Sequence, residues 1–462
     1  MVFHNGLFLF HRDLRLYDNT GLAEAIKQCE KVYTLFIFTP EQVSSKNTYK
    51  STNSVEFMIQ SLEHLEGEIK KNSGKLIIQY GNTMNVLKDV IENLSIDCVF
   101  FNYDLTPYAR ERTKNVESLC KKMNITCMHS HDYYLLKPGD VLTGNGTMYH
   151  KFTPFYEKYM LFNGIQDVNK KSVTKLATTR KTLSNTISLE NAFDKFVGRS
   201  NGDLFVKGGR NNGVMQLKRS LVSLKDYDQS RDTMSIQTSG LSAYLKYGCV
   251  SIREVYNGFK QKYGKFHELI RQLVWRDFFA HLLYFYPESL GKLYYQKMAG
   301  LKWSKNDRYL EAWKKGQTGV PLIDAGMRQM NETGYMHNRC RMLVATYLTK
   351  ILLIDWREGE KYFAQTLVDY DVASNSGNWQ SVVGGGVYAM PWFRVMSPWS
   401  QSKEYDSNCV YIKQWVKELS DVDPKIIHKW YKYCKTNDYK NIYKCPIVDD
   451  KKQKEKFMDM MK

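Results

Sequence analysis

Four arginines lie in segments with helical spacing, and their side chains are suited to binding phosphate. They are Arg231 in YDQSRD, Arg276 in LVWRDFF, and Arg339 with Arg341 in MHNRCRM. Side chains at positions i and i+2 of a helix do not share a face, so we expect Arg339 and Arg341 to bind different partners. A guanidinium is a rigid fork of donors that fits the phosphates of a nucleic acid or of a cofactor. The alternative, from these residues alone, is a set of surface ion pairs with nearby carboxylates.

The segment TSGLSAYLKYG places three hydroxyl side chains and a glycine where a helix is expected to begin. These residues are Thr238, Ser239, Gly240 and Ser242. Hydroxyls and free backbone N–H groups at a helix N-terminus can bind an anion. Ordinary helix capping explains the same pattern equally well.

A second polar group stands in LVDYDVASNSGNWQ, within the apolar half of the chain. Asp369, Asp371 and Asn375 cluster there in a turn rich in glycine and serine. These side chains could act as acid and base or hold the hydroxyls and ring N–H groups of a cofactor. A metal site is the least favoured use, because no histidine or third close carboxylate is present. A hydrogen-bonded turn with a helix cap is the structural alternative.

The tryptophans are confined to the second half of the chain, since all nine lie after residue 274. Trp303, Trp313, Trp356 and Trp379 are spread through helical sequence. Tryptophan most often fills a core. Base stacking and electron relay are the functional alternatives, and periodicity does not choose between them.

The sequence of the N-terminal part of the chain predicts a β-sheet. Short runs rich in Val, Ile and Phe recur at residues 6, 32, 75, 97 and 125, and helical spacing lies between them at 54–71 and 84–94. Buried strands that alternate with helices predict an α/β doubly wound parallel sheet. Neither GxGxxG after the first strand nor GxxxxGK[ST] occurs, so dinucleotide or triphosphate binding of those kinds is not supported.

After residue 206 the apolar spacing changes to three and four, which predicts an all-helical domain. We expect an α/β domain at 1–132, a surface connector at 133–205, a helical domain at 206–431 and a charged, peripheral tail at 432–462.

The composition limits the class of protein. The 462 residues carry 66 Lys and Arg against 48 Asp and Glu, a net charge of +18 that favours a polyanionic partner. No apolar run is long enough to cross a membrane and no secretory signal is visible, so we expect a cytoplasmic or nuclear protein. The nine cysteines form no CxxC pair, and free thiols are expected.

Several long strings resemble the photolyase/cryptochrome family. They are FHRDLRLYDN at 10–19, WRDFFAHL at 275, the block from 302 to 342 that contains MHNRCRM, LLIDWREGEKYFAQTLVDYDVASNSGNWQ at 352–380 and PWFRVMSPWSQSKEYD at 391–406. The resemblance covers nearly the whole chain, and MHNRCRM is similar to the class I cyclobutane pyrimidine dimer photolyases. The (6-4) photolyases carry a pair of histidines where this chain has His337 and Asn338.

The resemblance implies a flavin enzyme that uses light to split pyrimidine dimers in DNA, with FAD in its reduced form as the active cofactor. The positions that match FAD contacts of the family are Tyr227, Thr238, Ser239, Gly240, Leu241, Ser242, Gln272, Arg276, Asn338, Arg341, Asp369, Asp371 and Asn375. Asn375 matches the position that faces the flavin N5 atom. Trp379, Trp356 and Trp303 match, in that order outward from the flavin, the electron relay that reduces an oxidised cofactor.

The resemblance also implies a DNA-binding surface. The matching positions are Arg231, Gln272, Trp275, Arg276, Arg339, Met342 and Arg394. The chain departs from the pattern at three positions. Gln272 replaces a lesion-facing Glu, Ser381 replaces a second lesion-stacking Trp, and Tyr388 replaces an acidic residue.

In the N-terminal domain, Tyr108 and Ala109 replace a polar pair that contacts a folate antenna in some members. A folate antenna is therefore not expected. The alternatives are a deazaflavin antenna or no antenna at all. Overall the resemblance implies a monomeric deoxyribodipyrimidine photolyase that acts on UV-damaged DNA. The alternatives are a cryptochrome-like blue-light photoreceptor without repair activity and a (6-4) photoproduct photolyase.

Overall fold

The computed structural model describes residues 3–162, 164–171 and 173–461. The chain forms two compact units, and each contains more than one stretch of sequence. Unit 1 comprises 1–200, 206–225 and 239–287, and unit 2 comprises 201–205, 226–238 and 288–462. The domain ranges expected from the sequence stay predictions, because compactness alone does not define a domain.

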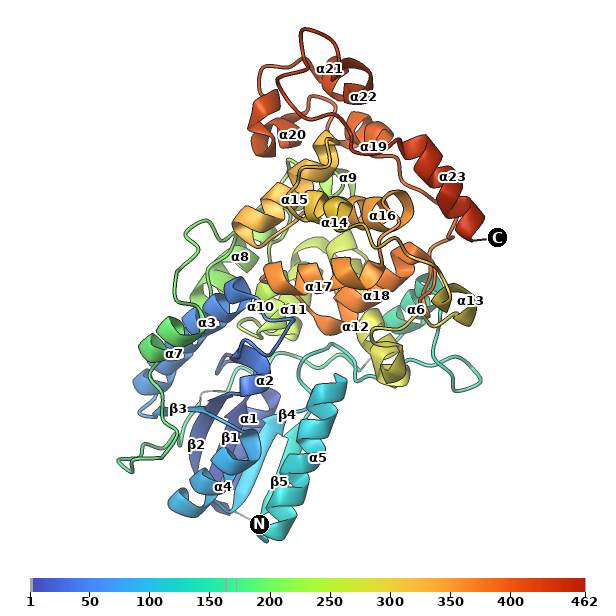
Figure 1. Cartoon of the computed structure of the whole chain (residues 1–462). Helices are drawn as coiled ribbons and strands as arrows, with labels where there is room; N and C mark the ends of the chain where they lie inside the picture. The colour runs from blue at the N-terminus through green and yellow to red at the C-terminus, as the bar shows by residue number, and fades with distance from the viewer. Residues whose placement is uncertain (1–2, 163, 172, 462) are drawn as a thin grey trace. The chain divides into compact units, whose positions relative to one another are not determined.

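Unit 1 is built on a parallel five-stranded sheet with the strand order β3-β2-β1-β4-β5 (Figure 1). The strands are β1 (Phe3–Phe10), β2 (Cys29–Phe38), β3 (Leu76–Tyr80), β4 (Cys98–Asn102) and β5 (Thr126–Ser130). Each of the five predicted apolar runs forms one of them, so the doubly wound sheet is confirmed.

Consecutive residues are buried in β1, β2, β3 and β4. Since successive side chains of a strand point to opposite sides, both faces of the sheet are covered at these strands. Leu7 and Leu9 lie in one core cluster with residues of α4 and α5, whereas Phe8 on the other face lies close to Gly21 of α1. The helices around the sheet are α1 (Thr20–Gln28), α2 (Pro40–Val43), α3 (Thr52–Lys71), α4 (Thr83–Leu94) and α5 (Pro107–Lys122). Two of them, α3 and α4, confirm the predicted helical stretches.

The remaining helices of unit 1 come from later in the chain. They are α6 (Phe152–Met160), α7 (Leu189–Phe196), α8 (Arg210–Ser223), α10 (Ser242–Lys246), α11 (Ile252–Tyr263) and α12 (Glu268–Phe285).

A buried ionic network joins α11 to the segment after β5. Asp132 lies 2.6 Å from Arg15 and 2.7 Å from Arg253, and Arg253 also lies 3.0 Å from Asp18. Burial raises the pKa of Asp132, but the two guanidinium groups outweigh it and hold that pKa well below its ordinary value. Removing one partner would leave a buried charge uncompensated, so this network fixes the helix strongly in place.

Unit 2 is helical and has one extensive core in which Trp313, Trp356, Trp379 and Trp430 are buried. Its elements are α9 (Tyr227–Ser230), α13 (Gln296–Ala299), α14 (Asp307–Lys314), α15 (Pro321–Thr333), α16 (Asn338–Thr346), the π-helix η2 (Tyr347–Ile351), α17 (Trp356–Thr366), α18 (Val372–Val383), α19 (Pro398–Tyr405), α20 (Val410–Trp415), η3 (Lys417–Leu419), α21 (Pro424–Ile427), α22 (Trp430–Tyr433) and α23 (Asp450–Met460). The short helix η1 (Pro287–Ser289) lies at the boundary between the units.

Two segments differ from the sequence-based description. The stretch expected to be a surface connector contains α6 and α7 and buries Phe152, Phe155 and Tyr159. The stretch after 432 is not peripheral, because Phe457 of α23 is fully buried in the core of unit 2. Polar residues in the first stretch and charged residues in the second concealed their few well-spaced apolar residues.

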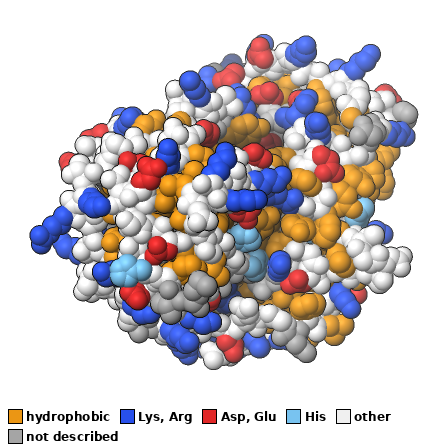
Figure 2. Space-filling model, turned by 90° about the horizontal axis from the view of Figure 1, so that it is seen from below, with side chains coloured by type: hydrophobic (Ala, Val, Ile, Leu, Met, Phe, Trp, Pro, Cys, Tyr) orange, Lys and Arg blue, Asp and Glu red, His pale blue; other side chains and the backbone are white. Residues whose placement is uncertain are grey.

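The surface is mixed in character. Figure 2 shows Lys and Arg side chains over the visible face, with acidic and hydrophobic side chains between them. Within the described residues, no helix is long and apolar enough to cross a membrane.

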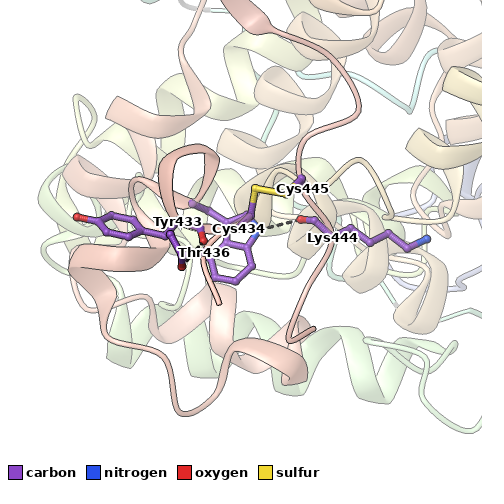
Figure 3. Close-up of a disulfide and its surroundings, with 6 residues drawn as sticks. Tyr433, Cys434, Thr436, Lys444 and Cys445 are labelled. Atoms are coloured by element: carbon purple, nitrogen blue, oxygen red, sulfur yellow. Dashed lines mark hydrogen bonds between the residues drawn. A yellow bond between two sulfur atoms is a disulfide. The ribbon is translucent and has the colours of Figure 1, made fainter. Parts of the chain in front are cut away.

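The expectation that all cysteines are free thiols is wrong for one pair. Cys434 and Cys445 form a disulfide, whereas the seven others are free thiols. Figure 3 shows Lys444 beside this disulfide. The carbonyl of Lys444 accepts from the indole Nε1 of Trp430 at 2.8 Å. Since the two cysteines are separated by eleven positions and show no motif, their spacing gave no sign of the pairing.

Candidate functional site

The predicted site residues are divided between the two units, which are described separately. Unit 1 holds Ser239, Gly240, Leu241, Ser242, Gln272, Trp275 and Arg276. Unit 2 holds Tyr227, Arg231, Thr238, Trp303, Asn338, Arg339, Arg341, Met342, Trp356, Asp369, Asp371, Asn375, Trp379 and Arg394.

In unit 1, hydrogen bonds from α8 fix the backbone of the predicted phosphate-side segment. The carbonyl of Ser239 accepts from Gln216 Nε2 at 2.6 Å and from Ser220 Oγ at 3.2 Å. Gly240 follows with φ +59°, in the left-handed region that favours glycine. Helix α10 then begins at Ser242, whose hydroxyl is exposed. The segment therefore combines a fixed backbone with an accessible helix start. Phosphate binding by this segment stays a prediction.

Helix α12 carries three predicted residues within one and a half turns. Gln272 Nε2 donates to Glu268 at 2.8 Å. Arg276 donates to the Tyr133 carbonyl at 2.6 Å, and its guanidinium lies 4.7 Å from the ring centroid of Tyr134. Trp275 stacks on Phe152 of α6, with the ring centroids 3.5 Å apart. Arg276 is therefore held by main chain and an aromatic ring, which leaves less of it free for phosphate than the sequence suggested.

Asp277 beside Arg276 is a structural residue that the sequence analysis missed. Its carboxylate accepts from the N–H groups of Leu135 and Leu136 at 3.0 and 3.2 Å and from the Tyr159 hydroxyl at 2.6 Å. Burial raises the pKa of Asp277 to about 6, although these hydrogen bonds lower it. Asp277 thus anchors the segment before α6 to α12, and a polar residue on an apolar helix face was its only signal.

In unit 2, Arg341 and Asp369 form an ion pair. One guanidinium nitrogen of Arg341 lies 2.9 and 3.1 Å from the two carboxylate oxygens, and Nε donates to the Met336 carbonyl at 2.8 Å. Burial lowers the pKa of Arg341, but the carboxylate of Asp369 raises it above its ordinary value. The structure therefore brings together two residues that the sequence placed in different motifs.

Arg339 points to different neighbours, as the i and i+2 spacing predicts. It lies 2.5 Å from Asp232 and 3.4 Å from the Gln401 side chain, with the Tyr405 ring centroid 4.3 Å from its guanidinium. Both Arg339 and Arg341 have carboxylate partners, as the ion-pair alternative expects, but the two pairs are partly buried and do not lie on the open surface.

His337 caps α16 and explains the geometry of this motif. Its Nδ1 accepts from the Arg339 N–H at 3.1 Å, and burial lowers its pKa to about 4. Asn338 is exposed, and Met342 one turn later is half-buried. A neutral histidine cap thus directs the start of α16.

The Asp and Asn cluster forms the start of α18. Asp371 is the N-cap and accepts from the Ser374 N–H at 3.0 Å. Asn375, one turn into the helix, donates to Glu360 Oε1 at 3.0 Å. Glu360 is buried and also accepts from the Tyr370 hydroxyl at 3.2 Å. Glu360 was missed because its position in REGEKYF is typical of an exposed helix face.

The remaining polar positions of unit 2 are less constrained. Thr238 hydrogen-bonds with the Tyr335 hydroxyl at 3.0 Å, and Tyr335 stacks on Phe205 with centroids 4.0 Å apart. Tyr227 begins α9 and is half-buried. Arg394 is exposed in the segment between α18 and α19.

Trp379 lies in the core of unit 2, against α17. Its ring contacts within the described residues are with Phe363 at 5.0 Å and Trp313 at 6.3 Å. A Cβ on Gly359 would lie 2.1 Å from the Trp379 ring, so the indole packs directly on this glycine. Trp356 begins α17 and is buried, whereas Trp303 is half-buried. Trp313 is therefore an aromatic neighbour of Trp379 that the relay prediction did not include.

The position of the missing aromatic residue is itself buried. Ser381 is 2% exposed, and its carbonyl accepts from Met390 at 3.1 Å. Trp392 nearby in sequence is half-buried, and Phe393 is 58% exposed. Aromatic surface is thus displayed about a dozen residues after the expected position.

The unit 2 residues have the chemistry that FAD needs. Arg341 offers donors to an anionic group, Asp369 and Asp371 offer acceptors to hydroxyl groups, and Asn375 offers both a donor and an acceptor. All four are partly accessible, whereas Glu360, the hydrogen-bond partner of Asn375, is buried. This donor set fits the cofactor.

Comparison with known proteins gives the same assignment. Residues 269–462 match the FAD binding domain of DNA photolyase, and residues 6–169 match the DNA photolyase domain. The deoxyribodipyrimidine photo-lyase of Alkalihalophilus pseudofirmus is 33% identical over 98% of this chain and 97% of its own length. The chain belongs to the photolyase/cryptochrome family.

Solved structures of this family share the fold of this chain. An archaeal photolyase from Sulfolobus tokodaii, crystallised with two FAD molecules, has a TM-score of 0.87 and 36% identity, with 99% of both chains covered. A cryptochrome from Synechocystis has a TM-score of 0.91 at 26% identity, with 100% of this chain and 99% of that chain covered. The sequence-based recognition and the fold class are confirmed, and FAD is the cofactor of the helical domain.

Proposed function

We propose that this photolyase splits cyclobutane pyrimidine dimers in DNA, with light as the energy source and FAD as the cofactor. The arrangement of Arg341, Asp369, Asp371 and Asn375 in unit 2 carries the proposal, because it supplies the donor set for FAD in a chain similar to deoxyribodipyrimidine photo-lyases over nearly its whole length. When bound and reduced, FAD supplies light absorption and an electron for the lesion.

The chain's own residues bind and orient the reactants. Arg341, fixed by Asp369, holds an anionic part of the cofactor, and Asn375, fixed by Glu360, presents its amide to the flavin ring. Because Glu360 is buried and accepts from two donors, the Asn375 amide has one preferred orientation. This network sets the hydrogen bonding around the ring.

The lesion reaches the flavin by leaving the duplex. Unstacking costs a few kcal/mol, and a damaged pair lowers that cost. Arg231, Arg339 and Arg394 are proposed to hold the phosphate backbone, while Trp275 and Met342 contact the lesion. Trp275 is preorganised for this role, because Phe152 stacks on one face of its ring.

Trp379, Trp356 and Trp303 are proposed to carry electrons to an oxidised cofactor. The burial of Trp379 and Trp356 and the half-burial of Trp303 agree with a path from the core toward solvent. No antenna is assigned. Ala109, at the folate-contact position, is buried, and the Sulfolobus relative with two FAD molecules makes a second flavin a candidate beside a deazaflavin.

A photoreceptor without repair activity is the second candidate. The likeness to the Synechocystis cryptochrome and the absence of a second lesion-stacking Trp at Ser381 favour it. Repair of (6-4) photoproducts is favoured by Gln272 and opposed by Asn338 and Met342.

The test uses chemically reduced protein under blue light with two oligonucleotides, one with a cyclobutane dimer and one with a (6-4) photoproduct. We expect recovery of thymine absorbance for the dimer only. Recovery for the (6-4) substrate alone would assign the other lesion. No recovery with either, despite retained FAD absorbance, would leave the photoreceptor function.

A further inference from the structure

A long irregular segment links α18 to α19 in unit 2. Residues 384–397 form no helix or strand, although they carry Trp392, Phe393 and Arg394. Phe393 is 58% exposed and Arg394 is exposed, so their side chains cannot hold the segment by packing. Irregular segments of this length need other contacts to adopt one conformation.

Lys350 supplies such contacts from the core. Its ammonium group donates to the carbonyl oxygens of Trp392 and Arg394 at 3.0 and 3.1 Å. Lys350 is only 1% exposed, and within the described residues no carboxylate pairs with it. The Phe457 ring of α23 lies 5.7 Å from Nζ. A buried ammonium without a counter-ion is costly, so its two carbonyl acceptors are its main compensation.

The backbone of Lys350 is unusual in the same place. It lies in η2, where Leu352 N–H donates to the Tyr347 carbonyl at 2.9 Å, a bond that spans five residues. Such π turns are rare and are found frequently at functional sites. Here the turn places a lysine, rather than an apolar residue, among the core residues Leu348 and Ile351.

We propose that Lys350 is a positioning residue that fixes the main chain of 392–394, so that Phe393 and Arg394 are presented to DNA. The two carbonyls point inward to Nζ while the intervening Phe393 side chain stays exposed. An exposed aromatic ring beside a guanidinium can stack on a base and bind a phosphate. Phe393 thereby replaces part of the aromatic surface lost at Ser381. The inference rests on the proposed function in one respect, that DNA is the partner.

The test compares Lys350→Met with wild type, with Lys350→Arg and with Thr349→Val. Thr349 is the buried neighbour whose hydroxyl donates to the Ala345 carbonyl, so its variant is a matched core change that removes no hydrogen bond to 392–394 among the described residues. Hydrogen exchange of the Phe393–Val395 amides in the free protein measures how firmly Lys350 holds this main-chain segment. Binding to a dimer-containing duplex in the dark measures the effect on DNA affinity.

We expect Lys350→Met to speed exchange at these amides and to weaken DNA binding about tenfold or more, the loss typical of one stacked base. Lys350→Arg should restore part of both, and Thr349→Val should change neither. Phe393→Ala, a surface variant that leaves the anchor intact, should weaken binding without faster exchange.

Two results would overturn the proposal: exchange in Lys350→Met no faster than in Thr349→Val, or wild-type DNA affinity in both Lys350→Met and Phe393→Ala. If Lys350→Met does not fold, Lys350→Arg and Phe393→Ala still decide. The two proposals can fail separately. If the wild type shows no repair but Lys350→Met and Phe393→Ala bind DNA more weakly than the wild type, the repair function is refuted and the role of Lys350 is supported.

Discussion

At the residue scale, the site depends on polar side chains that are oriented by hydrogen-bonding partners. Asn375 is oriented by Glu360, Arg341 by Asp369, and the start of α16 by the neutral His337. The sequence motifs identified Asn375, Arg341 and Asp369, but not Glu360. A motif identifies residues that meet a ligand, whereas supporting residues are defined by burial, which becomes visible only in three dimensions.

Replacing Trp379 by Phe should slow light-driven reduction of oxidised flavin at least tenfold, because Phe is far harder to oxidise than Trp. Repair by chemically reduced protein should stay within twofold of wild type. Trp430→Phe, at a fully buried Trp that has no ring contact with Trp379 among the described residues, is the matched control. The measurement is the decay of oxidised-flavin absorbance under blue light, and an unchanged decay in Trp379→Phe would remove it from the relay.

Lys350 should make stability depend on pH. Burial, with a smaller effect of Arg394, lowers its pKa from 10.5 to about 8. Below pH 8 both folded and unfolded states carry the proton, and the cost of burying the charge is fully present. Between pH 8 and 10.5 the folded state releases the proton first, so the free energy of unfolding rises with pH by up to about 3 kcal/mol from this group.

Urea unfolding of wild type and Lys350→Met across this pH range isolates the contribution, because the other titrating groups are common to both. We expect the wild-type curve to rise relative to the variant curve. Parallel curves would show that Lys350 keeps an ordinary pKa.

At the element scale, the strands and helices of the fold were largely predictable from the sequence. The long-range contacts that hold them together were not. The apolar runs of β1 to β5 and the spacing of α3 and α4 predicted the sheet, because buried elements have strong local periodicity. The compact unit around the sheet also includes α10 to α12, far along the chain. Contacts of such sequence separation, and the π-helix η2, leave no local pattern.

Packing between α17 and α18 gives a prediction at this scale. Gly359→Ala would place a Cβ 2.1 Å from the Trp379 ring and 2.6 Å from Leu348, so the ring or the helix must move. Overpacking of this kind costs about 1–3 kcal/mol of stability. Light-driven flavin reduction should slow as well.

Gly67→Ala in α3 is the matched control, since no atom lies within 4 Å of its Cβ position. It should stabilise the chain by roughly 0.5–1 kcal/mol through helix propensity. Thermal unfolding of both variants is the measurement. Equal stability of the two variants would contradict the close packing of Gly359 on Trp379.

At the scale of the whole molecule, the net charge of +18 fits the proposed DNA partner, and Lys and Arg side chains are spread over the face that Figure 2 shows. Family, fold and cofactor could be predicted from long motifs. The lesion could not, because Gln272 and Ser381 depart from the pattern in different directions. The structure adds that Ser381 is buried and that Phe393 offers aromatic surface nearby in sequence.

Arg339→Ala should weaken dark DNA binding and reduce the slope of log affinity against log salt by up to about 0.9, the value for one lost phosphate contact. The reduction can be smaller because Arg339 already pairs with Asp232. Lys456→Ala, at an exposed lysine of α23, controls for loss of one charge. Equal slopes for Arg339→Ala and the wild type would argue against a phosphate contact.

The proposed repair is catalytic: the electron that bound, reduced FAD supplies to the dimer would return to the flavin once the cyclobutane ring has opened, so the cofactor would end in its starting redox state. The most direct measurement counts the dimers split per protein molecule under blue light, with reduced flavin and no further reductant, against a dark control. We predict many dimers split per protein, none in the dark, and flavin that is still reduced at the end. No splitting in the light, or a yield that stops at one dimer per protein as the flavin becomes oxidised, would contradict the account.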